Sequence, residues 1–193
     1  SNYTYVDATV EKGKAYCYRV EAEFAKTSSG GFPFNPVQSL PSNEVCLQLN
    51  LDIPLITNVT IEETSANGRI LIKWVKPRTM DFDTIQNPGP YTYTLKRGIG
   101  FNPAAYTNVP NATFPSLNFL DPVDTSFTDI EINTIVSPYT YIVDFFAGQG
   151  GSLYGSSTSA SSVFLNVDGS DKKTILTWNE LVPWSNNSFT IYR

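Results

Sequence analysis

Apolar and polar residues alternate in short segments along most of this chain, which is the pattern of β-strands that bury one face. The segment Ala-Tyr-Cys-Tyr-Arg-Val-Glu-Ala shows it most clearly, because its apolar residues Tyr16, Tyr18 and Val20 stand at every second position. The same alternation recurs in Tyr-Thr-Tyr-Ile-Val-Asp-Phe-Phe-Ala, where we align Tyr141 with Tyr16. A Gly- and Ser-rich segment follows each copy and predicts a hairpin there. The repetition indicates that one β-sandwich module is present more than once.

The alternating segments and the turn formers between them predict a series of short strands. We expect strands over residues 3–10, 15–24, 44–49, 56–63, 69–76, 91–97, 126–132, 138–147, 161–167, 173–178 and 189–193, and one short edge strand within 101–125. The strand over 161–167 is expected to close the sheet of a complete unit. Short strands separated by turn signals in this way predict an all-β chain built of two-sheet sandwiches.

Internal repeats divide the chain into three parts. Lys173–Trp178 repeats the pattern of Arg69–Trp74, and Phe189–Arg193 repeats that of Tyr93–Arg97. Spacings of about a hundred residues indicate tandem domains rather than a short-period solenoid. We therefore predict the last strands of one sandwich in residues 1–51, a complete sandwich in 52–168 and the first strands of another in 169–193. Asp52-Ile53-Pro54 is expected to be a stiff linker, because Pro stops strand pairing.

These residues resemble tandem fibronectin type III domains, which have an immunoglobulin-like β-sandwich fold. Trp74 and Trp178 stand where that family has its core tryptophan on the second strand. Tyr16 and Tyr141 stand where it has a corner tyrosine, whose ring packs in the core while its hydroxyl bonds nearby backbone. The resemblance implies immunoglobulin-like sandwiches of fibronectin type III type in tandem along the whole chain.

Several phrases are also similar to a narrower family. They are Pro-Gly-Pro-Tyr within 83–91, Val-Pro-Trp within 176–184, and the segments Tyr16–Val20 and Ser42–Cys46. Together they resemble the repeats that precede the sorting domain of gliding-motility-associated proteins of Bacteroidetes, which are cargo of the type IX secretion system. The resemblance implies an extracellular or cell-surface protein attached to the outer membrane.

Composition excludes several classes of partner. The 193 residues are 41% hydrophobic and 13% aromatic, only 16% are charged, and the net charge is -5. No cluster of basic residues is present, so we expect no nucleic-acid partner. No apolar run approaches the ~18 residues that would span a bilayer, so we expect no membrane span in this chain.

The two cysteines are candidates for a structural disulfide. If Tyr16, Tyr18 and Val20 face the core, Cys17 points to the opposite face of its strand. Val45 and Leu47 turn Cys46 outward from its own strand in the same way. Cysteines on neighbouring strands pair where the register places them opposite each other, and such a bond fits a secreted protein. The alternative is two free thiols on the surface of the sheet.

The chain contains no histidine, which removes the Ser-His-Asp and Cys-His triads and the usual zinc sites. Paired carboxylates remain, but we find no aromatic platform beside them of the kind that binds sugars, so we predict no enzymatic activity. Calcium is a weaker possibility and the one cofactor considered. If two loops converge at one end of a domain, oxygen ligands would come from Asp81, Asp83, Asp121, Asp124 and Asp129.

Two loops are candidates for modification or binding. Asp83-Thr84-Ile85 resembles the Asp-Thr-aliphatic motif for O-glycosylation in Bacteroidetes, with Thr84 as the acceptor. The loop over 102–125 is the longest irregular stretch of the complete domain, and long loops on rigid scaffolds often bind ligands. Nothing in its sequence defines a ligand.

Taken together, the sequence predicts a non-enzymatic spacer or adhesion segment of a large secreted or surface-attached bacterial protein. Its expected partners are neighbouring domains of the same polypeptide, another copy that exchanges strands with it, and surface glycans. The alternative is an accessory module, spacing or glycan-binding, of an extracellular enzyme that degrades polysaccharides.

Overall fold

The computed structural model describes residues 3–7, 9–10, 15–27, 29–31, 33–48, 51–184, 186 and 188–192, and in these ranges it is all-β. In the part of the chain so described, no helix has the length and apolarity needed to span a membrane. The chain forms two compact units, residues 1–49 and 50–193. The first boundary thus lies close to the one expected from the sequence, and the last predicted part, 169–193, is grouped with the second unit.

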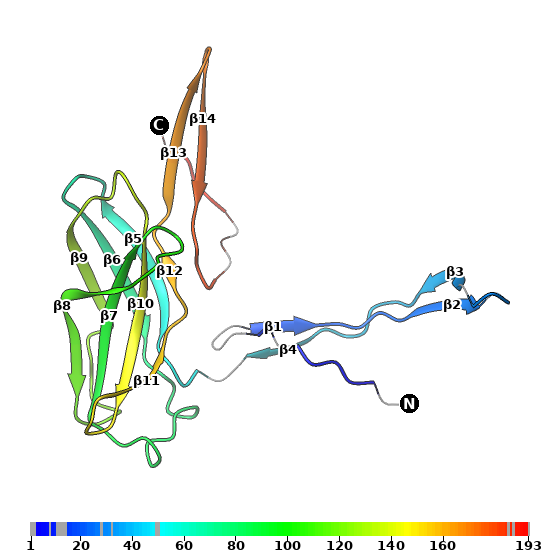
Figure 1. Ribbon diagram of the computed structural model, residues 1–193, viewed down its shortest axis with the longest axis horizontal. Coiled ribbons are helices and arrows are strands. Elements are labelled where there is room, and N and C mark those ends of the chain that lie inside the picture. The colour runs from blue at the N-terminus through cyan, green and yellow to red at the C-terminus, as the bar shows by residue number, and fades with distance from the viewer. Residues whose placement is uncertain are drawn as a thin grey trace. The chain divides into compact units, whose positions relative to one another are not determined.

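The second unit contains a sandwich of two antiparallel sheets (Figure 1). One sheet has the order β5-β6-β9. The other has the order β11-β10-β7-β8, with the short β12 also paired to β10. The bounds are β5 Leu55–Glu63, β6 Gly68–Val75, β7 Tyr91–Ile99, β8 Thr107–Ser116, β9 Ser126–Ile132, β10 Tyr139–Ala147, β11 Ser152–Ser156 and β12 Ala160–Ser161.

The core lies between the two sheets and is formed by the alternating positions that the sequence indicated. From β6, Ile70, Ile72 and Trp74 are buried, whereas the residues between them are partly or fully exposed. From β10, Tyr141, Val143 and Phe145 are fully buried. Aromatic rings fill much of this space, and they contact one another in stacked and edge-on pairs: Phe82, Tyr91, Tyr93, Phe119, Phe145 and Tyr154.

The long loop 78–90 is anchored to this core. Phe82 inserts from the loop and stacks on Phe119 with ring centroids 4.8 Å apart. The Lys76 ammonium donates to the backbone carbonyls of Phe119 and Asp121, at 2.5 and 2.9 Å. Burial lowers the pKa of Lys76. The two loops at this end of the sandwich are therefore held together by one aromatic pair and one lysine.

The segment predicted as a linker is packed on the sandwich instead. Leu51 and Pro54 are buried. The Leu51 N–H donates to Asp81 at 2.9 Å, and the Asp52 carboxylate accepts from the Tyr154 hydroxyl at 3.1 Å. Ile53 lies so close to β11 that a Cβ placed on Gly155 would be 2.7 Å from its side chain. Apolar burial holds this segment to the second unit, so the stiff linker expected at 52–54 is not there.

Two strand predictions in the complete sandwich were wrong. The segment 101–125 contains β8, a long strand rather than a short one, which tolerates Pro110 and Pro115 because it lies at the edge of its sheet. The sheet is closed by β11 and β12, so only Ser161 of the predicted closing strand 161–167 takes part. Residues 164–167 belong to β13, Phe164–Ser170, which pairs with β14, Lys173–Asn179, as a separate two-stranded hairpin. Residues 188–192, predicted to form part of a further strand, have no strand structure.

The first unit consists of two short antiparallel pairs. β1, Ala15–Tyr18, pairs with β4, Val45–Gln48, and β2, Glu23–Thr27, pairs with β3, Pro33–Gln38. The strand predicted over 15–24 is thus interrupted at 19–22. The described residues of 3–10, which were predicted to form a strand, form none.

Candidate functional site

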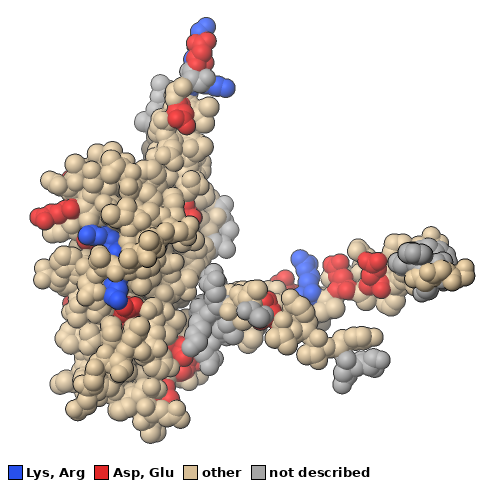
Figure 2. Space-filling view, in the orientation of Figure 1, with Lys and Arg blue, Asp and Glu red and all other residues tan. Residues whose placement is uncertain are grey.

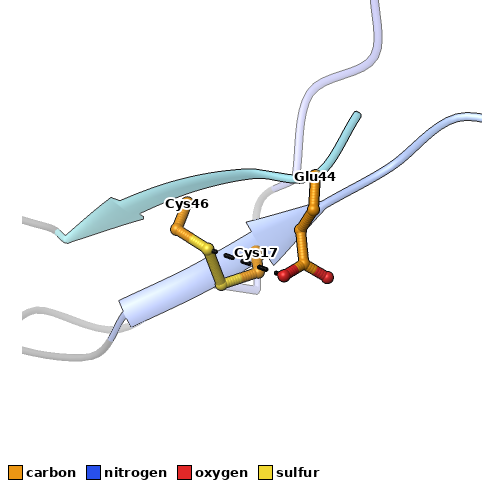
Figure 3. Close-up of side chains that lie close together, drawn as sticks. All are labelled: Cys17, Glu44 and Cys46. Atoms are coloured by element: carbon orange, nitrogen blue, oxygen red, sulfur yellow. Dashed lines mark hydrogen bonds between the residues drawn. A yellow bond between two sulfur atoms is a disulfide. The ribbon is translucent and has the colours of Figure 1, made fainter. Parts of the chain in front are cut away.

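Cys17 and Cys46 form the predicted cross-strand disulfide in the first unit (Figure 3). They are direct partners in the β1–β4 register, and their Cα atoms are 3.9 Å apart. Both side chains are exposed, as the alternation on each strand indicated. The disulfide therefore links β1 and β4 on the exposed face to which both cysteines point.

Glu44 lies beside the disulfide, with its carboxylate oxygen 4.0 Å from the Cys46 sulfur (Figure 3). Cys17, Glu44 and Cys46 are the group of potential metal ligands that the described residues bring together. A disulfide sulfur carries no thiolate charge and no proton, so this contact is neither a metal site nor a true hydrogen bond. The group is a structural cross-link with a neighbouring carboxylate.

We expect reduction of the disulfide to unfold the first unit and leave the sandwich intact. The bond closes a loop of 29 residues, for which chain entropy predicts a stabilisation of about 3–4 kcal/mol. Because the first unit buries little apolar surface, we expect that loss to exceed its stability. Amide hydrogen exchange with and without a reductant would measure it: β1 and β4 should lose protection while β10 keeps it. Equal protection of β1 in both conditions would contradict the prediction.

In the sandwich, Tyr141, Asp129 and Arg97 form a buried polar cluster that links the two sheets. The Arg97 guanidinium donates to both Asp129 oxygens at 2.8 and 2.9 Å, and the Tyr141 hydroxyl donates to the same carboxylate at 2.9 Å. The expected corner tyrosine therefore bonds a carboxylate instead of backbone. A hollow of about 410 Å³, lined in part by Arg97, Glu131 and Tyr139, lies beside the cluster. Because both Asp129 oxygens accept hydrogen bonds within the sandwich, this carboxylate has a structural role.

The buried tyrosines make the sandwich sensitive to alkaline pH. Burial raises the pKa of Tyr141 well above the ordinary value of about 10, and the charge of Asp129 adds to the effect. Burial likewise raises the pKa of Tyr93, whose hydroxyl has no hydrogen-bond partner among the described residues. A raised pKa in the folded state means that the stability contribution is complete below pH 10. It is lost as the pH rises further, because only the unfolded chain then releases the proton.

We expect the free energy of unfolding to fall above pH 10 by roughly 1.4 kcal/mol per pH unit for each of these two tyrosines. The Tyr93→Phe variant should show a shallower fall and no loss of stability at neutral pH, since the hydroxyl that it removes is unsatisfied. Urea unfolding between pH 8 and about 11 would test this. An identical pH dependence for wild type and variant would contradict it.

The five aspartates proposed for calcium are not brought together. Asp129 is bonded by Arg97 and Tyr141, and Asp81 accepts the Leu51 N–H. Asp83 accepts the N–H groups of Ile85 and Gln86, while Asp121 accepts from Asn118. Asp124 is exposed. Each bonded carboxylate stabilises its own part of the structure, so the described residues do not assemble the predicted set.

Because these carboxylates are dispersed, we expect calcium to have no effect on thermal unfolding. Melting curves of the sandwich in calcium and in EDTA should coincide. A melting temperature that rises with calcium concentration and returns on chelation would contradict the prediction. The Asp83→Asn variant would serve as control, since any change that it causes should then be independent of calcium.

Hydrogen bonds show which residues of the first unit correspond to the sandwich. In the sandwich, the Ser157 N–H donates to the Val143 carbonyl, and the Val143 N–H donates to the Ser157 hydroxyl. In the first unit, Ser42 makes the same two bonds with Val20. The Tyr18 hydroxyl bonds Asp7 at 3.0 Å, as the Tyr141 hydroxyl bonds Asp129.

The correct alignment of the first unit with the sandwich therefore differs by two residues from the one that the sequence suggested. Tyr18, and not Tyr16, is the counterpart of Tyr141. In this alignment the Cys17–Cys46 pair occupies the register position of Thr140 and Ser161. Tyr16 is half-buried and corresponds to Tyr139.

The β13–β14 hairpin carries an apolar groove of about 370 Å³. Trp178 is half-buried there and contacts the Phe189 ring, with centroids 5.4 Å apart. Trp178 is thus not inside a closed core as Trp74 is. The residues that line the groove are Val163, Leu165, Leu176, Trp178, Phe189, Thr190, Ile191 and Tyr192. The resemblance implied that Trp178 is a core residue, whereas in the structure the groove beside it is lined by exposed side chains.

Two other sequence features have clear places in the structure. Thr84 is exposed in a turn that Asp83 caps, so it is accessible, and its modification stays a prediction. Trp184 is half-buried and packs against the sandwich core. On the face that Figure 2 shows, the Lys and Arg side chains are few and do not form one large patch.

Comparison with known proteins found no match that would assign the chain to a family. No protein-family model matches it, and no curated protein matches it.

Proposed function

We propose that this chain is a non-enzymatic spacer or adhesion segment of a secreted or surface-attached bacterial protein, built of tandem fibronectin type III-like sandwiches. The order of strands supports the fold assignment, because a three-stranded sheet β5-β6-β9 faces a five-stranded sheet with the order β11-β10-β7-β8, in which β12 also pairs with β10. The disulfide supports an oxidising compartment, such as the cell exterior.

The observation that carries the proposal is that the same local structures recur before and after the complete sandwich along the sequence. The Val20–Ser42 pair of hydrogen bonds repeats Val143–Ser157. The β13–β14 hairpin pairs Leu165 with Trp178, as β5–β6 pairs Ile56 with Trp74. Parts of the sandwich pattern that recur before and after the complete sandwich support an array, and an array of rigid sandwiches would space or present other domains.

Resistance to pulling tests the spacer role. Stretching the chain between its ends should unfold the sandwich in one cooperative step, because β5–β12 share one core. At ~3.5 Å per extended residue, the residues from 51 to 161 have a contour length of about 39 nm, and the step should release this length less the distance between the two ends of the folded sandwich. Gradual extension without such a step would contradict a mechanical role.

Binding to polysaccharides separates a spacer from an adhesive or accessory module. We expect the chain, immobilised in its oxidised form, to retain no soluble plant or bacterial polysaccharide. Retention that exposed-aromatic variants such as Tyr3→Ala and Tyr5→Ala abolish would overturn the spacer role and favour glycan binding.

A further inference from the structure

The two ends of this chain present apolar faces that are covered in the complete sandwich. In β5–β6, Ile56 pairs with Trp74 and Val59 pairs with Ile72, and all four side chains are buried. In β13–β14, Leu165 pairs with Trp178 and Val167 pairs with Leu176. There Leu165 is 52% and Val167 is 59% exposed. The hairpin thus repeats the pairs of β5–β6 without the layer that would bury them.

The covering layer in the sandwich is β10, and the first unit contains its counterpart. Tyr141 and Val143 of β10 are fully buried in the same core cluster as Ile56, Ile72 and Trp74. Their counterparts Tyr18 and Val20 are 39% and 70% exposed. The first unit therefore presents the apolar strand that the hairpin face requires, and the hairpin presents the face that this strand requires.

The first unit also repeats the acidic part of the polar cluster. In the sandwich, Asp129 is bound by Tyr141 and by Arg97 from β7. In the first unit, Asp7 is bound by Thr9 and Tyr18, and these bonds lower its pKa. Asp7 thus stands where Asp129 stands, beside the strand that carries Tyr18 and Val20.

We propose that the β13–β14 hairpin of one copy of this chain packs on the first unit of a second copy and completes a sandwich between the two chains. The surface is heterologous, so reciprocal exchange closes a dimer, and exchange in one direction builds longer oligomers. Both faces lose exposed apolar surface, and the unpaired strand edges gain partners. This association goes beyond the spacer role and does not depend on it.

The sandwich predicts which residues meet. β6 pairs with β9 so that Ile70 lies opposite Asp129 and Leu71 opposite Thr128. Replacing β6 with β14, and β9 with the segment around Asp7, places Ile175 of one copy opposite Val6 of the other. Both side chains are exposed in the single chain, at 43% and 78%. Val6 of one copy and Ile175 of the other would lie close together only in the completed sandwich.

Crosslinking between two differently tagged variants tests this pairing. One copy carries Val6→Cys and the other Ile175→Cys, and a short bismaleimide is added under conditions that leave the Cys17–Cys46 bond oxidised. We expect a crosslinked product that contains both tags. The control replaces Ile175→Cys with Ile135→Cys, an exposed position on the sandwich, which should give little product. Equal yields in the two mixtures, or no product in either, would overturn the proposal.

Mass measurements on the unmodified chain supply an independent test. The average mass should rise with protein concentration, and Trp178→Asp or Val20→Asp should each weaken association about tenfold or more. Both positions lie outside the closed core, so the melting curve of the sandwich should be unchanged in each variant. A wild-type chain that stays monomeric at high concentration would overturn the exchange between copies. So would a chain carrying both Val6→Cys and Ile175→Cys that crosslinks only within itself.

Discussion

Replacing Phe145 with Ala is expected to lower the free energy of unfolding of the sandwich by about 3–5 kcal/mol. Phe145 is fully buried in β10 and has ring contacts with Phe82, Tyr91, Tyr93 and Tyr154, at centroid distances of 4.8–5.9 Å. Removing its ring loses the free energy gained by transferring the ring from water to the core, removes the aromatic contacts and leaves a cavity. The surrounding rings come from β7, from β11 and from loop 78–90, so they cannot all move inward to fill the space.

The next residue provides the control. Phe146 has the same side chain but points to the opposite face of β10, where it is half-buried. Phe146→Ala should therefore cost less than half as much. Urea unfolding followed by tryptophan fluorescence would measure both variants. Equal losses for Phe145→Ala and Phe146→Ala would show that the core does not lie where the structure places it.

Replacing Asp129 with Ala is expected to destabilise the sandwich by a similar amount, about 3–5 kcal/mol. The carboxylate is buried and accepts two hydrogen bonds from Arg97 and one from Tyr141. Without it, the guanidinium loses its counter-ion and the Tyr141 hydroxyl loses its acceptor. Both groups then remain in a place with little access to water, and an unpaired buried charge is far costlier than an absent pair.

A double substitution separates this explanation from simple loss of packing. If the penalty comes from an unpaired Arg97, the Arg97→Met and Asp129→Leu double variant should recover most of the stability that Asp129→Ala loses. Glu131→Ala, on the same strand and exposed, should change stability little. A loss below about 1 kcal/mol for Asp129→Ala would mean that the cluster contributes little to the fold.

Much of the sandwich was predictable, because strand alternation is a local property. The strands over 56–63, 69–76, 126–132 and 138–147 correspond to β5, β6, β9 and β10 within one residue at their ends. The same rule placed both cysteines on the outward faces of neighbouring strands, where they form the disulfide. It failed for β8, whose two prolines and many polar residues are tolerated only because that strand has one partner.

The sequence alone determined the β-class and the faces of most strands in the complete sandwich, and it predicted the Cys17–Cys46 disulfide that the structure contains. The tertiary structure decided which residues of the repeats are equivalent. A shift of two residues keeps every side chain on its face, so alternation cannot distinguish Tyr16 from Tyr18 as the counterpart of Tyr141. Only the hydrogen bonds of Ser42 and Asp7 select Tyr18.

The tertiary structure also decided the contacts between residues that are distant in the sequence. Arg97, Asp129 and Tyr141 meet because three strands from two sheets converge, and no spacing rule along the chain encodes that meeting. The segment 51–54 packs on the sandwich through buried Leu51 and Pro54 and through the contact of Ile53 with β11, although its proline suggested a stiff linker at 52–54. Local patterns determine the face of a strand, whereas burial of that face depends on which other parts of a chain are present to cover it.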